Sequence, residues 1–185
     1  MRLFIGLALS EEVRLTLGAV QSGLPGARWV TPQNIHLTLR FIGDIDPGRA
    51  EDIDTALRQI LVPAFDLTLS GLGSFESKGR VRALWTEASK SEPLKRLHEK
   101  IESAIVRAGE EPERRKFKPH VTLARFKSGS SNERIGMFIQ NNNDIQAGPF
   151  TVGRFTLFRS YLGHGGSIYE SLAEYELYER ITADV

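Results

Sequence analysis

A short motif occurs twice in this chain of 185 residues and constrains its fold more than any other feature. Residues 36–39 are His-Leu-Thr-Leu, and residues 120–123 are His-Val-Thr-Leu. The chain has only four histidines, and two of them belong to this repeat. Successive side chains of a strand point to opposite faces, so the histidine and threonine of each copy share one face. The repeat therefore predicts two strands, each with an imidazole beside a hydroxyl on one face and aliphatic side chains on the other.

These side chains suit acid and base chemistry on a phosphate. Histidine exchanges a proton near neutral pH, and a threonine hydroxyl can donate a hydrogen bond to an anionic oxygen. One His-x-Thr on a strand would be weak evidence, because both residue types also serve packing. Two copies at corresponding places favour a catalytic interpretation, with His36 and His120 as an acid and a base and Thr38 and Thr122 as phosphate ligands.

The predicted elements follow the same order in both halves of the chain. In the first half we expect a strand, a helix, the motif strand, a helix and a strand, over residues 2–9, 10–21, 35–42, 48–61 and 65–72. In the second half we expect a strand, a helix, the motif strand, a helix and two strands, over residues 81–87, 93–109, 118–126, 132–141, 150–159 and 169–177. We therefore expect an α/β (α+β) fold in a single domain over residues 1–185. Its two pseudo-twofold lobes of antiparallel sheet would have outer helices and share a central cleft that carries both motif strands.

Composition restricts the class of protein. The chain is 41% hydrophobic and 25% charged, as is usual for a globular protein, and its net charge of +1 argues against unspecific nucleic-acid binding over the whole surface. The first nine residues are apolar but only as long as a strand, and Glu11 and Glu12 follow them, which is not typical of a signal peptide. We expect a cytoplasmic protein that does not enter a membrane.

The sequence gives little support for a metal site or for further catalytic histidines. It has no cysteine and no His-Glu-x-x-His motif, and the partner of each motif histidine is a threonine, which is a poor zinc ligand. We expect metal-independent chemistry without a cofactor. His98 shares a helix face with charged residues and is expected to be solvated, and His164 in the glycine-rich segment 163–166 is expected to lie on the surface.

A basic segment precedes the second motif directly. Residues 114–118 are Arg-Arg-Lys-Phe-Lys. Such a run is usually a solvated loop, but here it could also form a rim for a polyanionic chain, with Phe117 as a stacking surface for a base. Phe4 and Phe41 are further candidates for base stacking, with burial in the core as the alternative for both.

At these residues the chain resembles the two-histidine (2H) phosphoesterase superfamily, and more closely its RNA 2′,3′-cyclic phosphodiesterases, first described as 2′-5′ RNA ligases. The resemblance spans nearly the whole chain and is carried by residues 1–4, 34–43, 117–125, 158–160 and 169–170. It implies a bilobal fold in which the motifs face each other across a cleft. It also implies hydrolysis of a 2′,3′-cyclic phosphate at an RNA or oligonucleotide end to a 2′-phosphate.

The resemblance also implies roles for individual residues. His36 would be the general acid, His120 the general base, and Arg125 a phosphate ligand beside the two threonines. Strict alternation from His120 would put Ala124 on the cleft face instead of Arg125. A β-bulge or the end of the strand would correct this, and Arg40 is the substitute if neither is present.

Two other functions remain open at this stage. The same site could join RNA ends through a 2′-5′ linkage, or the fold could bind nucleotides or RNA ends without turnover. Hydrolysis is expected to dominate, because water is abundant and the sequence has no lysine motif for ATP-dependent nucleotidyl transfer. The two intact motifs argue against a module that only binds. We expect a monomer that acts on RNA ends.

Overall fold

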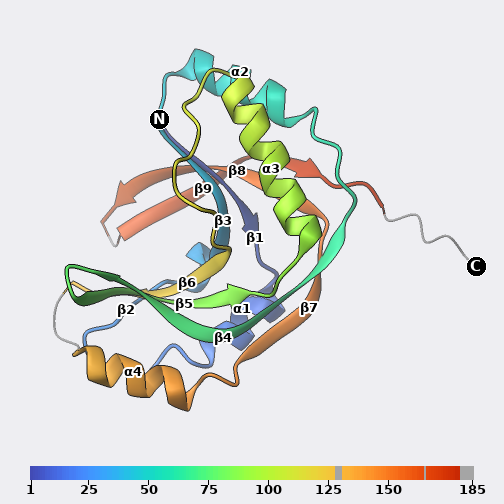
Figure 1. Ribbon diagram of the computed structural model, residues 1–185. Helices are drawn as coiled ribbons and strands as arrows, with labels where there is room; N and C mark the ends of the chain where they lie inside the picture. Colours follow the sequence, from blue (N-terminus) through green and yellow to red (C-terminus); the bar gives the residue numbers. More distant parts are fainter. Residues whose placement is uncertain (128–130, 165, 180–185) are drawn as a thin grey trace, which may run out of the picture.

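A computed structural model describes residues 1–127, 131–164 and 166–179, and within them the chain forms one antiparallel sheet with helices on its outer faces (Figure 1). The strands are β1 (Arg2–Ala8), β2 (Arg28–Trp29), β3 (His36–Asp44), β4 (Phe65–Ser77), β5 (Arg80–Ala88), β6 (His120–Arg125), β7 (Gln146–Val152), β8 (Arg154–Gly163) and β9 (Gly166–Glu176). The helices are α1 (Glu11–Gly18), the short 3₁₀ helix η1 (Pro32–Asn34), α2 (Pro47–Leu57), α3 (Glu92–Arg107) and α4 (Asn132–Asn141). The expected α/β fold with antiparallel sheet is confirmed.

The two motif strands lie next to each other at the centre of the sheet. The strand order is β7-β4-β5-β6-β3-β1-β8-β9, and the short β2 also pairs with β6. β3 and β6 pair at one position, where Leu37 is opposite Val121. Each motif strand also pairs with the strand that lies before the preceding α-helix in the chain: β3 pairs with β1, and β6 pairs with β5. The sheet thus has the predicted pseudo-twofold arrangement, with the β3–β6 contact at its centre.

The chain connects the two ends of the sheet directly. The chain passes from β7 to β8 through Gly153, although these strands lie near opposite ends of the strand order. Beside this connection, the Leu177 N–H donates to the Gly153 carbonyl at 2.8 Å, and the Ala64 N–H donates to the Tyr178 carbonyl at 2.8 Å. The prediction of one strand over residues 150–159 was therefore wrong, because Gly153 divides that stretch between two strands with different partners.

Local sequence explains where the helices begin. Every α-helix in the described ranges starts after a residue whose side chain accepts a hydrogen bond from the backbone N–H three residues further on. These capping residues are Ser10, Asp46, Ser91 and Ser131.

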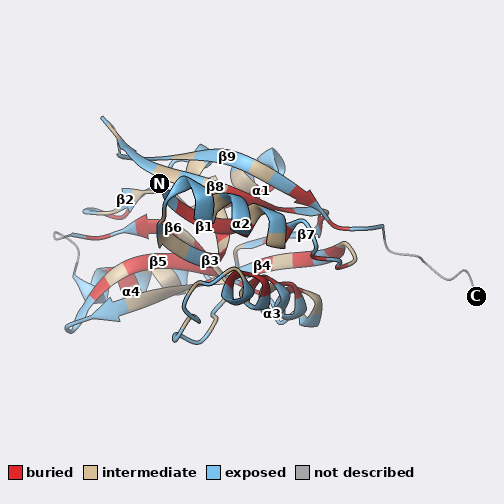
Figure 2. Ribbon diagram, turned by 90° about the horizontal axis from the view of Figure 1, so that it is seen from above, coloured by how far each residue is buried: buried red, intermediate tan, exposed pale blue. Residues whose placement is uncertain are grey.

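The helices cover different strands of the sheet. α1 packs against β7 and α4 against β5, while α3 packs against β3 and α2 (Figures 1 and 2). Among the described residues, no helix combines the length and hydropathy needed to span a bilayer.

The β4–β5 hairpin is longer than the sequence suggests. We expected the strand to end near Leu72 because of the glycines on either side, yet β4 continues to Ser77. Gly71, at φ +68°, is an extra residue in β4 and makes a β-bulge. Gly73 is opposite Trp85, and a Cβ atom on it would lie 2.3 Å from the indole ring. The two glycines therefore bend the strand and make room for Trp85 instead of ending it.

We expect Gly73→Ala to lower the free energy of unfolding by about 1–3 kcal/mol, because the added methyl group overlaps Trp85 and forces it to move. Urea denaturation would measure the change. The matched control is Gly136→Ala within α4, where an added Cβ has no neighbour within 4 Å. That variant should gain about 0.5–1 kcal/mol from helix propensity. Equal effects of the two substitutions would contradict this explanation of Gly73.

Candidate active site

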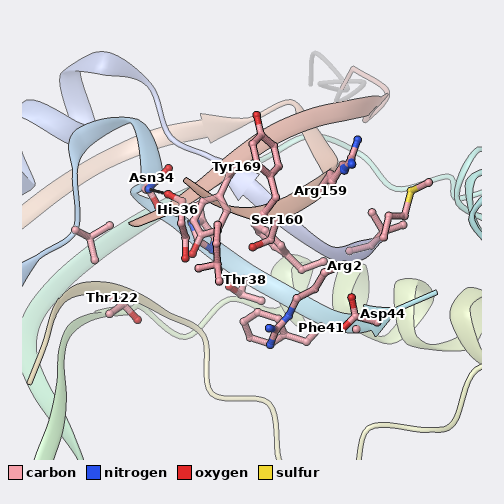
Figure 3. Close-up of a pocket in the computed structure, with 18 of the residues that line it drawn as sticks. Arg2, Asn34, His36, Thr38, Phe41, Asp44, Thr122, Arg159, Ser160 and Tyr169 are labelled. Atoms are coloured by element: carbon pink, nitrogen blue, oxygen red, sulfur yellow. Dashed lines mark hydrogen bonds between the residues drawn. The ribbon is translucent and has the colours of Figure 1, made fainter. Parts of the chain in front are cut away.

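A cleft of about 820 Å³ runs along the junction of the two halves. Its walls include five residues predicted for catalysis and phosphate binding, with the candidates Phe4 and Phe41 beside them: His36, Thr38, His120, Thr122 and Arg125. Figure 3 shows Thr122 on one side of the cleft, with His36 and Thr38 on the other. The alternation of each motif strand places its histidine and threonine in the cleft and its aliphatic residues in the core. The fold thus brings both motifs into one site.

A β-bulge places Arg125 in the cleft. In the β5–β6 ladder, Trp85 is opposite Thr122 and Leu84 is opposite Ala124, so Leu123 is an extra residue in β6. The bulge shifts the alternation by one residue, which buries Ala124 and leaves Arg125 exposed on the wall of the cleft. The β-bulge that was needed to bring Arg125 to the cleft face is therefore present.

The first motif strand has the same irregularity at the corresponding place. In the β1–β3 ladder, Gly6 is opposite Thr38 and Ile5 is opposite Arg40, so Leu39 is the extra residue. Arg40 is consequently buried and Phe41 lines the cleft. Phe41 thus occupies in one half the position that Arg125 occupies in the other.

Each histidine is oriented by a backbone carbonyl two residues before it. His36 Nδ1 lies 2.7 Å from the Asn34 carbonyl oxygen, and His120 Nδ1 lies 2.6 Å from that of Lys118. A carbonyl oxygen can only accept, so Nδ1 carries the hydrogen in both rings. This leaves Nε2 of each ring for chemistry. His36 Nε2 lies 2.9 Å from the Thr38 hydroxyl, so the two groups of the first motif are already in contact.

Aromatic rings pack against both imidazoles. The ring of His36 has its centroid 4.9 Å from that of Phe4 and 5.1 Å from that of Tyr169. The ring of His120 has its centroid 4.8 Å from that of Phe75, at nearly a right angle. The aromatic contacts and the carbonyl bonds together fix the position of each ring before a substrate binds.

Burial lowers the pKa of His36 below its ordinary value of 6.5, and the hydrogen bond to Asn34 opposes this shift only in part. The positive charges of Arg125 and His120 lower the pKa of His36 further. Burial also lowers the pKa of His120, with the bond to the Lys118 carbonyl again opposing it. Both imidazoles therefore favour the neutral form in the cleft, and an anionic group bound between them would favour a protonated one.

Arg40 does not face the cleft, and the condition under which it would substitute for Arg125 as a phosphate ligand is not met, because the bulge in β6 is present. Its side chain is 9% exposed, and its Nε donates to a Glu102 carboxylate oxygen at 2.6 Å. Its Nη2 donates to the Glu111 carbonyl at 2.5 Å. Arg40 instead ties α3 and the segment before the second motif to β3. The bulge at Leu39 explains the burial of Arg40, because it shifts the alternation of β3 by one residue.

Of the three aromatic candidates for base stacking, Phe4 takes the alternative of burial and Phe117 does not line the cleft. Phe4 is 3% exposed and supports His36 from below, so it is not available to a base. Phe117 stacks on His98 with a centroid distance of 3.9 Å and does not line the cleft. The same contact shows that His98 is partly buried and not simply solvated. Phe4 and Phe41 both line the cleft, and of these two only Phe41, with 52% of its surface exposed, has an accessible ring.

The duplicate motif does not reveal several other residues that contribute to the site. The carbonyls of Asn34 and Lys118 act through the backbone, so side-chain identity does not reveal them. Arg2 and Arg115 also line the cleft. The basic segment was a signal for Arg115, and Arg2 lies two residues before Phe4 on the same face of β1. In the parts of the chain that the structure describes, no three His, Asp or Glu side chains gather as a metal site would require.

Comparison with known proteins agrees with this geometry. The model of the 2'-5' RNA ligase superfamily matches residues 10–164, which include both motifs and all but the first and last strands. The chain belongs to the 2'-5' RNA ligase superfamily. The 2H phosphoesterase resemblance drawn from the motifs is thereby confirmed.

Similar proteins match over nearly the full length. The chain is 32% identical to an RNA 2',3'-cyclic phosphodiesterase of Aeropyrum pernix over 162 residues, which cover 87% of this chain and 92% of that protein. It is also 32% identical to an RNA 2',3'-cyclic phosphodiesterase of Thermotoga maritima, with 94% of each chain covered. The structure of TT0787 of Thermus thermophilus superimposes with a TM-score of 0.82 at 27% identity, over 97% of this chain and 100% of that one.

We expect nuclear magnetic resonance to find the neutral forms of His36 and His120 protonated at Nδ1, which is the less common tautomer of free histidine. Long-range ¹H–¹⁵N correlation spectra of the imidazole rings would show the tautomer directly. The solvent-exposed His164 provides an internal reference. A spectrum in which either motif histidine carries its hydrogen on Nε2 would contradict the proposed orientation of that ring.

Proposed function

We propose that this protein hydrolyses 2′,3′-cyclic phosphate ends of RNA or oligonucleotides to 2′-phosphates by general acid and base catalysis. The observation that carries the proposal is the duplicate geometry of the site. Each motif directs one imidazole Nε2 into the same cleft, and each imidazole is held at Nδ1 by a carbonyl. The two relatives described above bear the name of the same activity, which supports it.

Opening the cyclic phosphate requires one proton transfer on each side of phosphorus. Water attacks phosphorus in line with the 3′ oxygen, so the P–O bond to water forms as the P–O3′ bond breaks. We assign His120 as the base that takes the proton from water at Nε2. His36 is then the acid that gives the proton on Nε2 to the departing 3′ oxygen. Exchange of one proton with solvent restores both histidines.

The remaining groups stabilise the charge on the non-bridging oxygens. Thr38 and Thr122 can donate hydroxyl hydrogen bonds, and Arg125 can donate two parallel bonds from its guanidinium. All three line the cleft beside the histidines. Donors that are fixed before the reaction are effective because they need not reorganise as charge develops. The site can thus provide acid, base and anion stabilisation from its own side chains, and we propose that the reaction needs no metal ion.

The wider assignments follow from the same site. The cleft takes residues from both halves of the sheet, so we propose that the chain acts as a single domain. Both histidines come from one chain, and a monomer therefore suffices for activity. We further propose that the protein acts in the cytoplasm, on RNA ends and without a membrane partner.

We expect EDTA-treated protein to convert an oligoribonucleotide with a 2′,3′-cyclic end into the 2′-phosphate. His36→Ala and His120→Ala should each lower kcat about 10²–10⁴-fold, because each removes one proton-transfer group. Product analysis by gel electrophoresis would distinguish the 2′-phosphate from the 3′-phosphate. His164→Ala, outside the cleft, serves as the control and should retain full activity. Joining of ends in the presence of a 5′-hydroxyl RNA, or binding without turnover, would favour the alternative functions.

The roles of the histidines can be separated with a substrate whose 3′ bridging oxygen is replaced by sulfur. A thiolate leaves without being protonated, so this substrate should restore most of the rate lost in His36→Ala and little of that lost in His120→Ala. Equal rescue of both variants would refute the assignment of His36 as the acid.

We expect a bell-shaped dependence of kcat/KM on pH with its maximum below pH 6.5. This parameter reports the pKa values of the free enzyme, and those of both histidines are lowered from 6.5. A lowered pKa lets the base stay unprotonated at lower pH, and it makes the acid lose its proton at lower pH. Both limbs of the curve therefore shift in the acidic direction. A flat profile between about pH 5 and 9 would contradict catalysis by two histidines.

A further inference from the structure

The two motif histidines are reached by the chain in different ways. The first motif follows η1, whose last residue, Asn34, supplies the carbonyl that binds His36. Residues 110–119, all described by the structure, lead from α3 to β6 without forming a helix or strand (Figure 1). The Lys118 carbonyl that binds His120 belongs to this irregular segment. Its position therefore depends on tertiary contacts of the segment and not on local secondary structure.

A partly buried carboxylate on α3 holds the start of this segment. One oxygen of Glu102 accepts a hydrogen bond from the Glu113 backbone N–H at 2.8 Å. The other oxygen accepts from Arg40 Nε on β3 at 2.6 Å, and Arg40 Nη2 donates to the Glu111 carbonyl at 2.5 Å. Glu102 and Arg40 thus attach the main chain of the segment to α3 and β3 at two places.

An aromatic stack on the same helix holds the end of the segment. His98 lies one turn before Glu102, so both side chains are on the same face of α3. The ring of His98 stacks on that of Phe117, with a centroid distance of 3.9 Å and an interplanar angle of 6°. Phe117 also packs against the hydrophobic core. The stack fixes the residue that directly precedes Lys118.

The β4–β5 hairpin holds Lys118 itself. The Lys118 ammonium lies 4.5 Å from the centroid of the Trp85 ring and 5.4 Å from that of Phe75, which are cation–π contacts. The Phe75 ring also packs against His120. The main chain before the second motif is therefore held by α3 through one residue and by the hairpin through the next.

We propose that His98 and Glu102 are positioning residues for His120. They fix the segment of residues 110–119 so that the Lys118 carbonyl meets His120 Nδ1 and directs Nε2 into the cleft. His98 acts as a flat ring in this role and not as a proton carrier. This inference rests on the proposed function, in which His120 is the general base.

Steady-state kinetics on an oligoribonucleotide with a 2′,3′-cyclic end tests the positioning role. His98→Ala and Phe117→Leu should each lower kcat about 10-fold, because a small displacement of the base slows proton transfer. KM should change little, since Thr38, Thr122 and Arg125 are intact. His98→Phe keeps a ring for the stack and should restore most of the rate.

A milder change tests the carboxylate. Removal of the Glu102 or Arg40 side chain would leave its partner's charge without compensation and destabilise the fold. Glu102→Gln keeps the size of the side chain but has one acceptor oxygen for two N–H donors. It should lower kcat in the same direction as His98→Ala. A substrate with sulfur in place of the 3′ bridging oxygen should restore little of the loss in any of these variants, because the defect lies at the base.

Two control variants separate positioning from general effects on the protein. Glu99→Ala changes the exposed neighbour of His98, which pairs only with Lys95 at 3.9 Å, and should keep the full rate. Tyr175→Phe removes a hydrogen bond to Asp54 at 2.6 Å outside the cleft. It should lower Tm without lowering kcat.

Nuclear magnetic resonance of the imidazole rings tests the geometry without turnover. In Phe117→Leu and His98→Ala the Nδ1 hydrogen of His120 should exchange faster with solvent, and the tautomer with hydrogen on Nε2 should appear. The His36 signals should stay unchanged, because the Asn34 carbonyl does not belong to this segment.

The outcomes distinguish the two proposals. If the wild-type protein does not hydrolyse the cyclic end, the proposed function fails, and the His120 spectra still decide whether α3 positions the ring. If the variants keep both kcat and the His120 spectrum, the positioning role is refuted. It is also refuted if both histidines are disturbed alike, or if kcat falls no more than in Tyr175→Phe at an equal loss of Tm. Loss of kcat with a change confined to His120 supports the proposal.

Discussion

The contact between β3 and β6 is the constraint on which the site depends. These strands meet where Leu37 is opposite Val121, and both side chains are fully buried. Once that pair is buried, the alternation of each strand directs the residues before and after it into the cleft. A histidine and a threonine from each strand then line one space. Hydrophobic burial at the junction thus fixes the positions of the polar groups, and no direct contact between the two motifs is needed.

The main chain determines which nitrogen of each histidine can react. The carbonyls of Asn34 and Lys118 bind Nδ1 of the histidine two residues later, and the two arrangements are alike although the preceding sequences differ. Because the peptide supplies the acceptor, the side chains of those residues are free for other tasks. The Asn34 amide donates to the Ser167 carbonyl in β9. The Lys118 ammonium lies 4.5 Å from the centroid of the Trp85 ring.

The sequence predicted the parts of the fold that depend on the spacing of apolar residues and on the residues at which helices start. The duplicate motif indicated the two central strands, and helical spacing of apolar residues with local start signals indicated the α-helices, with α4 predicted at its observed bounds. Strict alternation could not place the residues that follow each motif threonine. The bulges at Leu39 and Leu123 bring Phe41 and Arg125 to the cleft, and the sequence could name a bulge before Arg125 only as one of two alternatives. The stacking of Phe117 on His98 depends on tertiary packing, which a local pattern does not contain.

The exchange of helices between the two halves of the sheet has a consequence for cooperativity. α3 follows β5 in the chain but packs against β3, and α1 follows β1 but packs against β7. Each half is therefore covered in part by a helix that belongs in sequence to the other. Part of the cover of each apolar face would be missing if the halves were separated. This shared core packing favours cooperative unfolding, and a hinge motion that changed the spacing between the two histidines would disturb it.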